Sequence, residues 1–324
     1  MPVYVNTNYS ALQGQRYLGN VQNSLTTTYQ RLSSGLRINS AKDDAAGLQI
    51  ADRLTSQING LNQGNRNASD GIALAQTIES GMDEISGMLQ KIRTLTVQAA
   101  NGTNTKEDRA ALSKEATALA TEINRIATQT TFAGKTVLNG MGSSSIFGKD
   151  AGNQNGTAGK AGKTGTMTLQ VGSNKGDTIS FDIDSVMFSK IAVEAGGNKL
   201  IGTDKIFATK DTTGAVTVTF TKANFADATN QEYIGKVIEL MDTAISNVDG
   251  MRAGLGALQN RLESSIRNQS NVAANEADAR SRIRDADFAE ESANLSQQSI
   301  IQQAAASMLM QANTRPQLGL SLLG

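Results

Sequence analysis

The chain has 324 residues, 30 Lys and Arg against 30 Asp and Glu, only two Pro, and no His, Cys or Trp. Without His or Cys it cannot supply an imidazole base, a Ser-His-Asp triad, a thiolate nucleophile or a disulfide, so we do not expect an enzyme, a metal site or a cofactor. A formal charge of zero offers no basic patch for nucleic acid or an anionic membrane, whereas neutrality permits copies of the chain to associate.

Long soluble helices are the first structural prediction. The two Pro residues are Pro2 and Pro316, so the strongest helix breaker is absent between them. No apolar run approaches the roughly 20 residues of a membrane span, and the first residues lack the charged and apolar regions of a cleavable signal. We therefore expect no membrane insertion.

Apolar residues recur at alternating steps of three and four, which is typical of helices packed against other helices. In the first stripe Gly35 indicates the end of the helix, and Ser40 with Asp43 then predicts a capping box that opens the next one. The first stripe consists of Leu18, Val21, Leu25, Tyr29, Leu32 and Leu36. Later stripes run from Leu48 to Ile92, from Leu112 to Ile126 and from Ile234 to Leu262.

These stripes predict a mainly α fold, an elongated antiparallel helical bundle or coiled coil built from both chain ends. The middle of the chain differs. Residues 140–165 are rich in Gly, Ser, Asn and Lys, which indicates a flexible surface loop. Alternating apolar residues predict a β-hairpin over 166–184 and a second, weaker hairpin over 206–220. The expected insertion is thus small and β-hairpin-rich.

The two chain ends carry few apolar residues for their length. Ordering about 80 such residues costs on the order of 100 kcal/mol of conformational entropy, which a lone amphipathic helix cannot offset. We therefore expect both ends to be disordered in the monomer and to fold only against copies of themselves. At the C-terminal end the thin stripe consists of Leu295, Ile301, Ala305, Met308 and Ala312.

Three runs of residues resemble bacterial flagellin. They are LSSGLRINSAKDDAAGL at 32–48, ASDGI at 68–72 and RDADFA at 284–289. The resemblance covers roughly residues 1–140 and 230–324, and between them it extends only to the hairpin.

The resemblance implies a subunit that is exported unfolded, polymerises into the helical filament used for swimming, and is not an enzyme. It implies a filament core from 1–43 plus 284–324, a rod domain from 44–190 plus 226–283, and a small outer insertion at 191–225. Implied partners are other copies of the chain, an export chaperone on the C-terminal helix, and the flagellar cap and hook-junction proteins. The residues that would pack in the core are Leu18, Leu25, Leu32, Leu36, Leu295, Ile301 and Met308.

The second helix carries a candidate contact face. A buried stripe through Ile85, Leu89 and Ile92 leaves Lys91, Leu95 and Gln98 on another face, with Leu95 directed outward. In flagellins this face lies between subunits and is recognised by a Toll-like innate immune receptor. The positions that match the receptor pattern are Gln90, Lys91, Leu95, Gln98 and Glu115, with Lys91 where Arg is usual and Thr94 where Glu is usual.

Charged residues cluster where the terminal segments would join the rod. An ordinary solvated helix face is one explanation, and a hinge or inter-subunit role is the other. The residues are Asp43, Asp44, Arg282, Arg284, Asp285 and Asp287. A hook-filament junction protein, which shares the terminal architecture of flagellins, is the alternative to a filament subunit.

Overall fold

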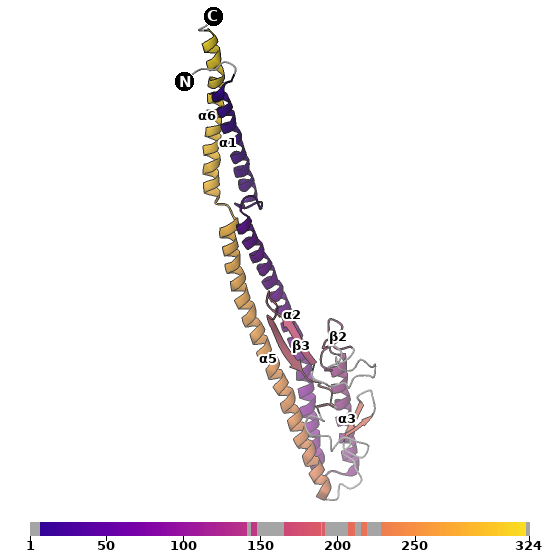
Figure 1. The fold of residues 1–324 in the computed structure, drawn as a ribbon. Helices are drawn as coiled ribbons and strands as arrows, with labels where there is room; N and C mark the ends of the chain where they lie inside the picture. The colour runs from indigo at the N-terminus through magenta and orange to yellow at the C-terminus, as the bar shows by residue number, and fades with distance from the viewer. Residues whose placement is uncertain are drawn as a thin grey trace. The chain divides into compact units, whose positions relative to one another are not determined.

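The computed structural model describes residues 7–140, 144–147, 165–188, 190–191, 207–210, 215–218 and 228–321. The contacts divide the chain into two units. Unit 1 comprises Met1–Gly60 and Asn271–Gly324, and unit 2 comprises Leu61–Ser270. Helices dominate both units, so the mainly α class is confirmed (Figure 1).

Unit 1 is built around a pair of helices from the two chain ends. Helix α1 (Tyr9–Ser34) and helix α6 (Phe288–Ser321) lie side by side in Figure 1. They are antiparallel, because Asn8 Nδ2 donates to the main-chain oxygen of Ala312, 2.8 Å away, while Arg31 pairs with Glu291 at the other end. The start of helix α2 (Ala45–Ala100) and the end of helix α5 (Ala228–Arg284) complete the unit.

Unit 2 contains the main hydrophobic core. The remainder of α2 and α5 run antiparallel there, as Arg252 pairs with Asp83 at 2.9 Å and Asn65 donates to Ser270 at 3.3 Å. Helix α3 (Lys106–Gln129) adds a third layer. The predicted stripes supply the core: Ile78, Met82, Ile85, Leu89, Ile92, Ala116, Ile123, Val237, Met241, Ala244, Val248, Leu255, Leu258 and Leu262 are all buried.

The helix starts differ in part from those predicted. Helix α2 begins at Ala45, where Asp44 Oδ1 accepts from the N–H of Gly47 at 2.9 Å. The expected Ser40–Asp43 box is a separate turn before the helix, so its assignment as the helix start was wrong. A reciprocal capping box does open α3, where Thr105 and Asp108 each accept a main-chain hydrogen bond from the other.

Both predicted hairpins are confirmed. Strands β3 (Gly165–Gln170) and β4 (Thr178–Ile183) are antiparallel and place Leu169 opposite Ile179. Strands β5 (Phe207–Lys210) and β6 (Ala215–Val218) form the second pair. A third, shorter pair joins β1 (Thr131–Phe132) to β2 (Lys135–Thr136).

Two glycines let the first hairpin approach α2 closely. A Cβ at Gly64 would lie 2.1 Å from the carbonyl oxygen of Val171, and one at Gly71 would lie 2.5 Å from Leu169 Cδ1. Asn67 adds a hydrogen bond from its Nδ2 to the main-chain oxygen of Gln170, 2.9 Å away. The hairpin therefore approaches the α2 backbone at the two glycines and is held there by the Asn67 side chain.

The predicted loop at 140–165 lies mostly outside the described residues. Its described part, 144–147, packs against unit 2: the N–H of Ile146 donates to Thr136 at 3.0 Å and Phe147 is buried. A wholly flexible loop is therefore wrong for these four residues. The domain limits expected at 43, 191, 225 and 284 concern the assembled filament and stay a prediction.

Candidate assembly surface

Local hydrogen bonds define both ends of α1. The side chain of Asn8 accepts from the N–H of Ala11, as an N-cap does. At the other end Gly35 adopts a left-handed conformation, φ 71°, and its N–H donates to Arg31 at 2.9 Å. The helix thus ends at the glycine that the sequence indicated, and Leu36 lies beyond it rather than on its stripe.

The chain beyond α1 is joined to the segment between α5 and α6. Leu36 forms an antiparallel bridge with Asp285. The N–H of Arg37 donates to the main-chain oxygen of Arg284 at 2.7 Å, and the N–H of Ala286 donates to Gly35 at 3.0 Å. Main-chain hydrogen bonds therefore hold the two connections together within unit 1.

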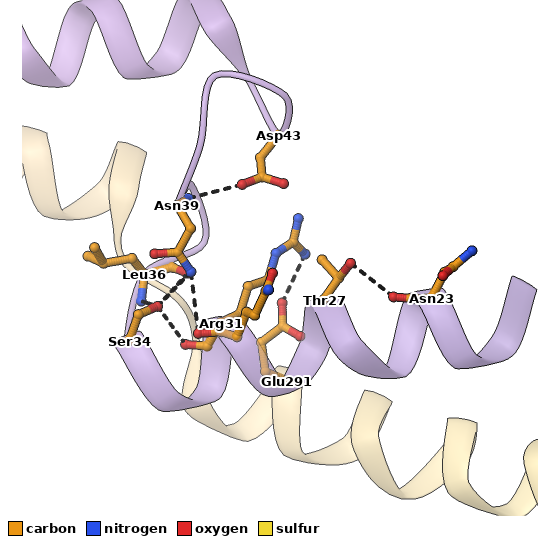
Figure 2. A network of polar contacts seen from close by, with 9 residues as sticks. Asn23, Thr27, Arg31, Ser34, Leu36, Asn39, Asp43 and Glu291 are labelled. Atoms are coloured by element: carbon orange, nitrogen blue, oxygen red, sulfur yellow. Dashed lines mark hydrogen bonds and ion pairs between the residues drawn. The ribbon is translucent and has the colours of Figure 1, made fainter.

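The predicted junction carboxylates act as local caps. Asp43 Oδ2 accepts from the main-chain N–H of Asn39 at 3.1 Å (Figure 2). It also accepts from the main-chain N–H of Ser40 at 2.9 Å. Backbone and side-chain hydrogen bonds from Ser40 lower the pKa of the Asp43 carboxyl. Asp287 Oδ1 accepts from the N–H of Ala289 at 2.8 Å and caps the start of α6.

The remaining junction charges are placed differently. Arg282 is exposed and pairs with Asp278 at 3.0 Å, one turn earlier on α5. Asp285 accepts from the Ser281 hydroxyl at 2.6 Å. Arg284 contributes its main-chain oxygen, while its buried Nε has no hydrogen-bond partner. Arg282 thus forms a solvated pair, whereas a hinge or inter-subunit role for the junction charges stays a prediction.

An ion pair that sequence analysis missed joins the two terminal helices beside this connection. Arg31 Nη1 lies 3.1 Å from Glu291 Oε1, and the Glu291 side chain is only 9% exposed (Figure 2). The two residues are 260 positions apart, so no spacing within the sequence could indicate the pair. An unpaired buried carboxylate is costly, and this pair joins the end of α1 to the start of α6.

Part of the predicted terminal stripe on α1 is covered within the chain itself. Leu25 is buried, and Leu18 and Leu32 are half-buried, as expected for the face that meets α6. Tyr29, however, is exposed, and Thr28 occupies the buried position instead. Steps of three and four in strict alternation through Leu18, Leu25 and Leu32 place position 28, and not position 29, on the stripe. This explains why Thr28 is buried and Tyr29 is exposed.

On α6 the predicted core residues do not all face α1, and their packing in the filament stays a prediction. Leu295 is half-buried, but Ile301 is 41% and Met308 72% exposed. The face that meets α1 contains polar residues, so apolarity alone does not mark it. That face is made of Glu291, Leu295, Gln298, Gln302, Ala305, Leu309 and Ala312, all buried or half-buried.

Large apolar side chains therefore point outward from unit 1. Among the described residues, every large hydrophobic side chain with substantial exposure lies in unit 1, except Val97. Exposed apolar patches are typical of interaction surfaces. We call this set the outward apolar side chains: Tyr9, Leu12, Tyr17, Tyr29, Ile50, Val272, Phe288, Ile300, Ile301, Met308 and Met310.

Four of the five residues predicted to form a contact face on unit 2 are exposed, and their role as contacts stays a prediction. Gln90, Lys91 and Gln98 on α2 are exposed, as is Glu115 on α3. Leu95 is only 7% exposed and belongs to the core, so its outward direction was wrong. The buried stripe continues past Ile92 through Leu95 and Ala99, rather than ending at Ile92.

Gln90 and Lys91 border a hollow of about 510 Å³ on unit 2. Its wall also carries Asp83, Asp249 and Arg252, and Arg252 pairs with Asp83 at 2.9 Å. The described residues hold no cluster of three or more potential metal ligands. None of the helices in the described ranges combines the length and apolar character needed to cross a bilayer.

Comparisons with known proteins identify the family. The profile of the bacterial flagellin N-terminal helical region matches residues 5–143, and that of the C-terminal helical region matches residues 238–323. The chain is 38% identical to flagellin D of Vibrio anguillarum and to polar flagellin F of Vibrio parahaemolyticus, over the full length of each protein.

A solved structure of a Vibrio parahaemolyticus protein assigned as flagellar hook-associated covers 75% of the chain and 100% of its own length, with a TM-score of 0.52 and 16% identity. That likeness shows the fold alone, whereas the full-length identity favours a filament subunit over a hook-junction protein. The chain belongs to the bacterial flagellin family and is a structural subunit of the extracellular flagellar filament.

Proposed function

We propose that α1 and α6 are the polymerisation element of this subunit and that neighbouring copies cover the outward apolar side chains. The observation that carries the proposal is their concentration in unit 1. Burying one large apolar side chain stabilises by about 1.5–3 kcal/mol. Several of them per subunit suffice against an association cost of about 4–15 kcal/mol.

Order in the terminal helices is coupled to assembly in this proposal. The described part of unit 1 buries few apolar side chains within the chain itself: Leu25, Ile38, Ala51 and Ile58. Such a small core supports the prediction that residues 1–40 and the C-terminal helix are disordered in the monomer. Well-dispersed NMR signals from these residues in isolated monomer would contradict it.

Substitution of the outward side chains tests the polymerisation element. Tyr17→Gln and Ile300→Gln change exposed positions on α1 and α6, so neither disturbs the contact between the two helices. We expect the critical concentration for seeded polymerisation to rise by at least about tenfold for each, because about 1.4 kcal/mol corresponds to tenfold. Gln15→Ala, also exposed on α1, is the matched control and should polymerise normally.

Secretion belongs to the same proposal. We infer that the chain is exported unfolded, that the chaperone holds α6 in a groove through its apolar side chains, and that the cap and hook-junction proteins meet the assembled ends. Ile300 and Ile301 lie on the face that would be held. Purified export chaperone should then inhibit polymerisation, and Ile300→Gln should weaken its binding.

For recognition by a Toll-like receptor, the exposed positions Gln90, Lys91, Gln98 and Glu115 are proposed as contacts. Leu95 acts in this proposal by packing, which keeps α2 in place. Lys91→Ala should reduce the response of reporter cells to monomer without changing its free energy of unfolding. An unchanged response would remove Lys91 from the contact set.

We propose that the subunit has no catalytic role. Enzymatic turnover that copurifies with homogeneous filaments and is lost with a single point substitution would refute this. The division into a filament core at 1–43 plus 284–324 and a rod at 44–190 plus 226–283, with an outer insertion at 191–225, stays part of the proposal. A density map of the filament would test it.

A further inference from the structure

Two methionines stand out on α6. Met308 and Met310 are 72% and 67% exposed, more than any other Met among the described residues. Met82 and Met241, by contrast, are fully buried in the core of unit 2. The chain therefore offers a pair of accessible thioethers together with internal references that solvent does not reach.

Helix geometry explains the exposure. Leu309 lies between the two methionines and faces α1, where its Cδ1 would be 3.1 Å from a Cβ at Gly14. Successive residues on a helix are about 100° apart, so Met308 and Met310 project on either side of that contact. Packing of α6 on α1 covers Leu309 and leaves both thioethers uncovered.

The facing part of α1 also carries exposed apolar side chains. The N-terminal part of α1 runs beside this part of α6, since Asn8 donates to Ala312 and Gly14 faces Leu309. Tyr9 and Leu12, on the same part of α1, are more than half exposed. A methionine that becomes polar would thus lie among the outward apolar side chains of unit 1.

We propose that Met308 and Met310 form an oxidation-sensitive site through which peroxides control assembly. Hydrogen peroxide transfers one oxygen atom to the thioether: an S–O bond forms, the O–O bond breaks, and the other oxygen leaves as water. Sulfur is oxidised by two electrons and the peroxide is reduced by the same two. Methionine sulfoxide reductases reverse the change with a dithiol as reductant, which supplies two electrons and two protons so that the oxygen leaves as water.

This inference rests on the proposed polymerisation element. A sulfoxide is polar, and its oxygen requires a hydrogen-bond donor that an apolar contact does not supply. An oxidised subunit therefore polymerises poorly. Once the side chains are covered by neighbouring copies, the same thioethers are protected. The oxidation-sensitive state is the unassembled subunit.

Peptide mapping by mass spectrometry tests the accessibility. Full-length monomer and filaments of the same protein are treated with hydrogen peroxide, and sulfoxide formation is followed at each methionine. In the monomer, Met308 and Met310 should oxidise at least about tenfold faster than Met82 and Met241. In filaments the two rates should fall to those of the buried pair. Equal rates in the monomer, or no protection in filaments, would overturn the proposal.

Seeded polymerisation then tests the consequence. Oxidised monomer should show a critical concentration raised by about tenfold or more, because each buried sulfoxide lacks a hydrogen-bond partner. The double variant Met308→Leu/Met310→Leu should polymerise equally well before and after peroxide. Sensitivity of this variant equal to that of the unsubstituted protein would assign the effect to other residues and refute the site.

A further arm covers the case in which the double variant fails to polymerise. Treatment of oxidised, unsubstituted subunits with both sulfoxide reductases should restore their original critical concentration, and failure to do so would contradict the proposal. An unchanged critical concentration for the Tyr17→Gln variant without peroxide treatment would instead refute the proposed polymerisation element. The two failures are therefore distinguishable.

Discussion

Gly64→Ala in α2 should change the free energy of unfolding through two effects of opposite sign. Alanine is favoured over glycine inside a helix by about 1 kcal/mol. At this position, however, the new methyl group would lie 2.1 Å from the carbonyl oxygen of Val171 and 2.7 Å from its carbon. Both are main-chain atoms of the hairpin end, so neither can move by a simple side-chain rotation.

Overpacking of this kind costs about 1–3 kcal/mol and can exceed that range. We therefore expect Gly64→Ala to lower the free energy of unfolding by up to about 2 kcal/mol after the gain in helix propensity. Gly87 is the matched control, because it lies on the same helix with no atom within 4 Å of an added Cβ. Gly87→Ala should raise stability by up to about 1 kcal/mol.

Urea denaturation of full-length monomer, followed by helical circular dichroism, measures both variants. The midpoint should fall for Gly64→Ala and rise for Gly87→Ala. Hydrogen exchange gives a local reading, because the N–H of Val171 donates to Asp177 at 2.9 Å and should exchange faster when the hairpin end is displaced. Equal stabilisation by both substitutions would refute the close seat of the hairpin on α2.

Three further changes have defined outcomes. Hydrogen bonds from Thr105 lower the pKa of Asp108 below its ordinary value of 3.8. The ionised cap therefore stabilises α3 above that pH, and this stabilisation is lost as the pH falls through the lowered pKa. In an acid titration the Thr105→Val variant should lose less stability than the unsubstituted protein. Arg31→Ala leaves Glu291 buried without its partner and should destabilise the pair of terminal helices by about 1–3 kcal/mol. Faster hydrogen exchange in α1 of the filament measures this loss, and simultaneous replacement of Arg31 and Glu291 by Leu should recover most of it. Leu95→Ala should cost about 2–5 kcal/mol in urea denaturation, and a cost below 0.5 kcal/mol would contradict its burial.

The long helices were predictable because their apolar residues repeat with the helical period. Ile78 through Ile92 on α2 and Val237 through Leu262 on α5 bury the faces that the pattern indicates. The first hairpin was predictable for a similar reason, since alternation of period two leads directly to the pairing of Leu169 with Ile179.

Contacts that depend on tertiary structure were not predictable. The inner face of α6 includes Gln298 and Gln302, so a search for apolar residues selected Ile301 and Met308 on other faces. The same limit applies to Arg31 and its partner, which are close only after both chain ends pair. For Leu95 the information was in the sequence, as continuing the stripe by one step of three from Ile92 reaches it.

In the proposed assembly, neighbouring copies cover the outward faces of α1 and α6. Hydrogen exchange of the same protein as monomer and as filament measures this most directly. We predict that amides of Tyr9–Ser34 and Phe288–Ser321 exchange rapidly in the monomer and slowly in the filament, while the core of unit 2 is slow in both. Equal exchange of the terminal helices in monomer and filament would contradict the claim.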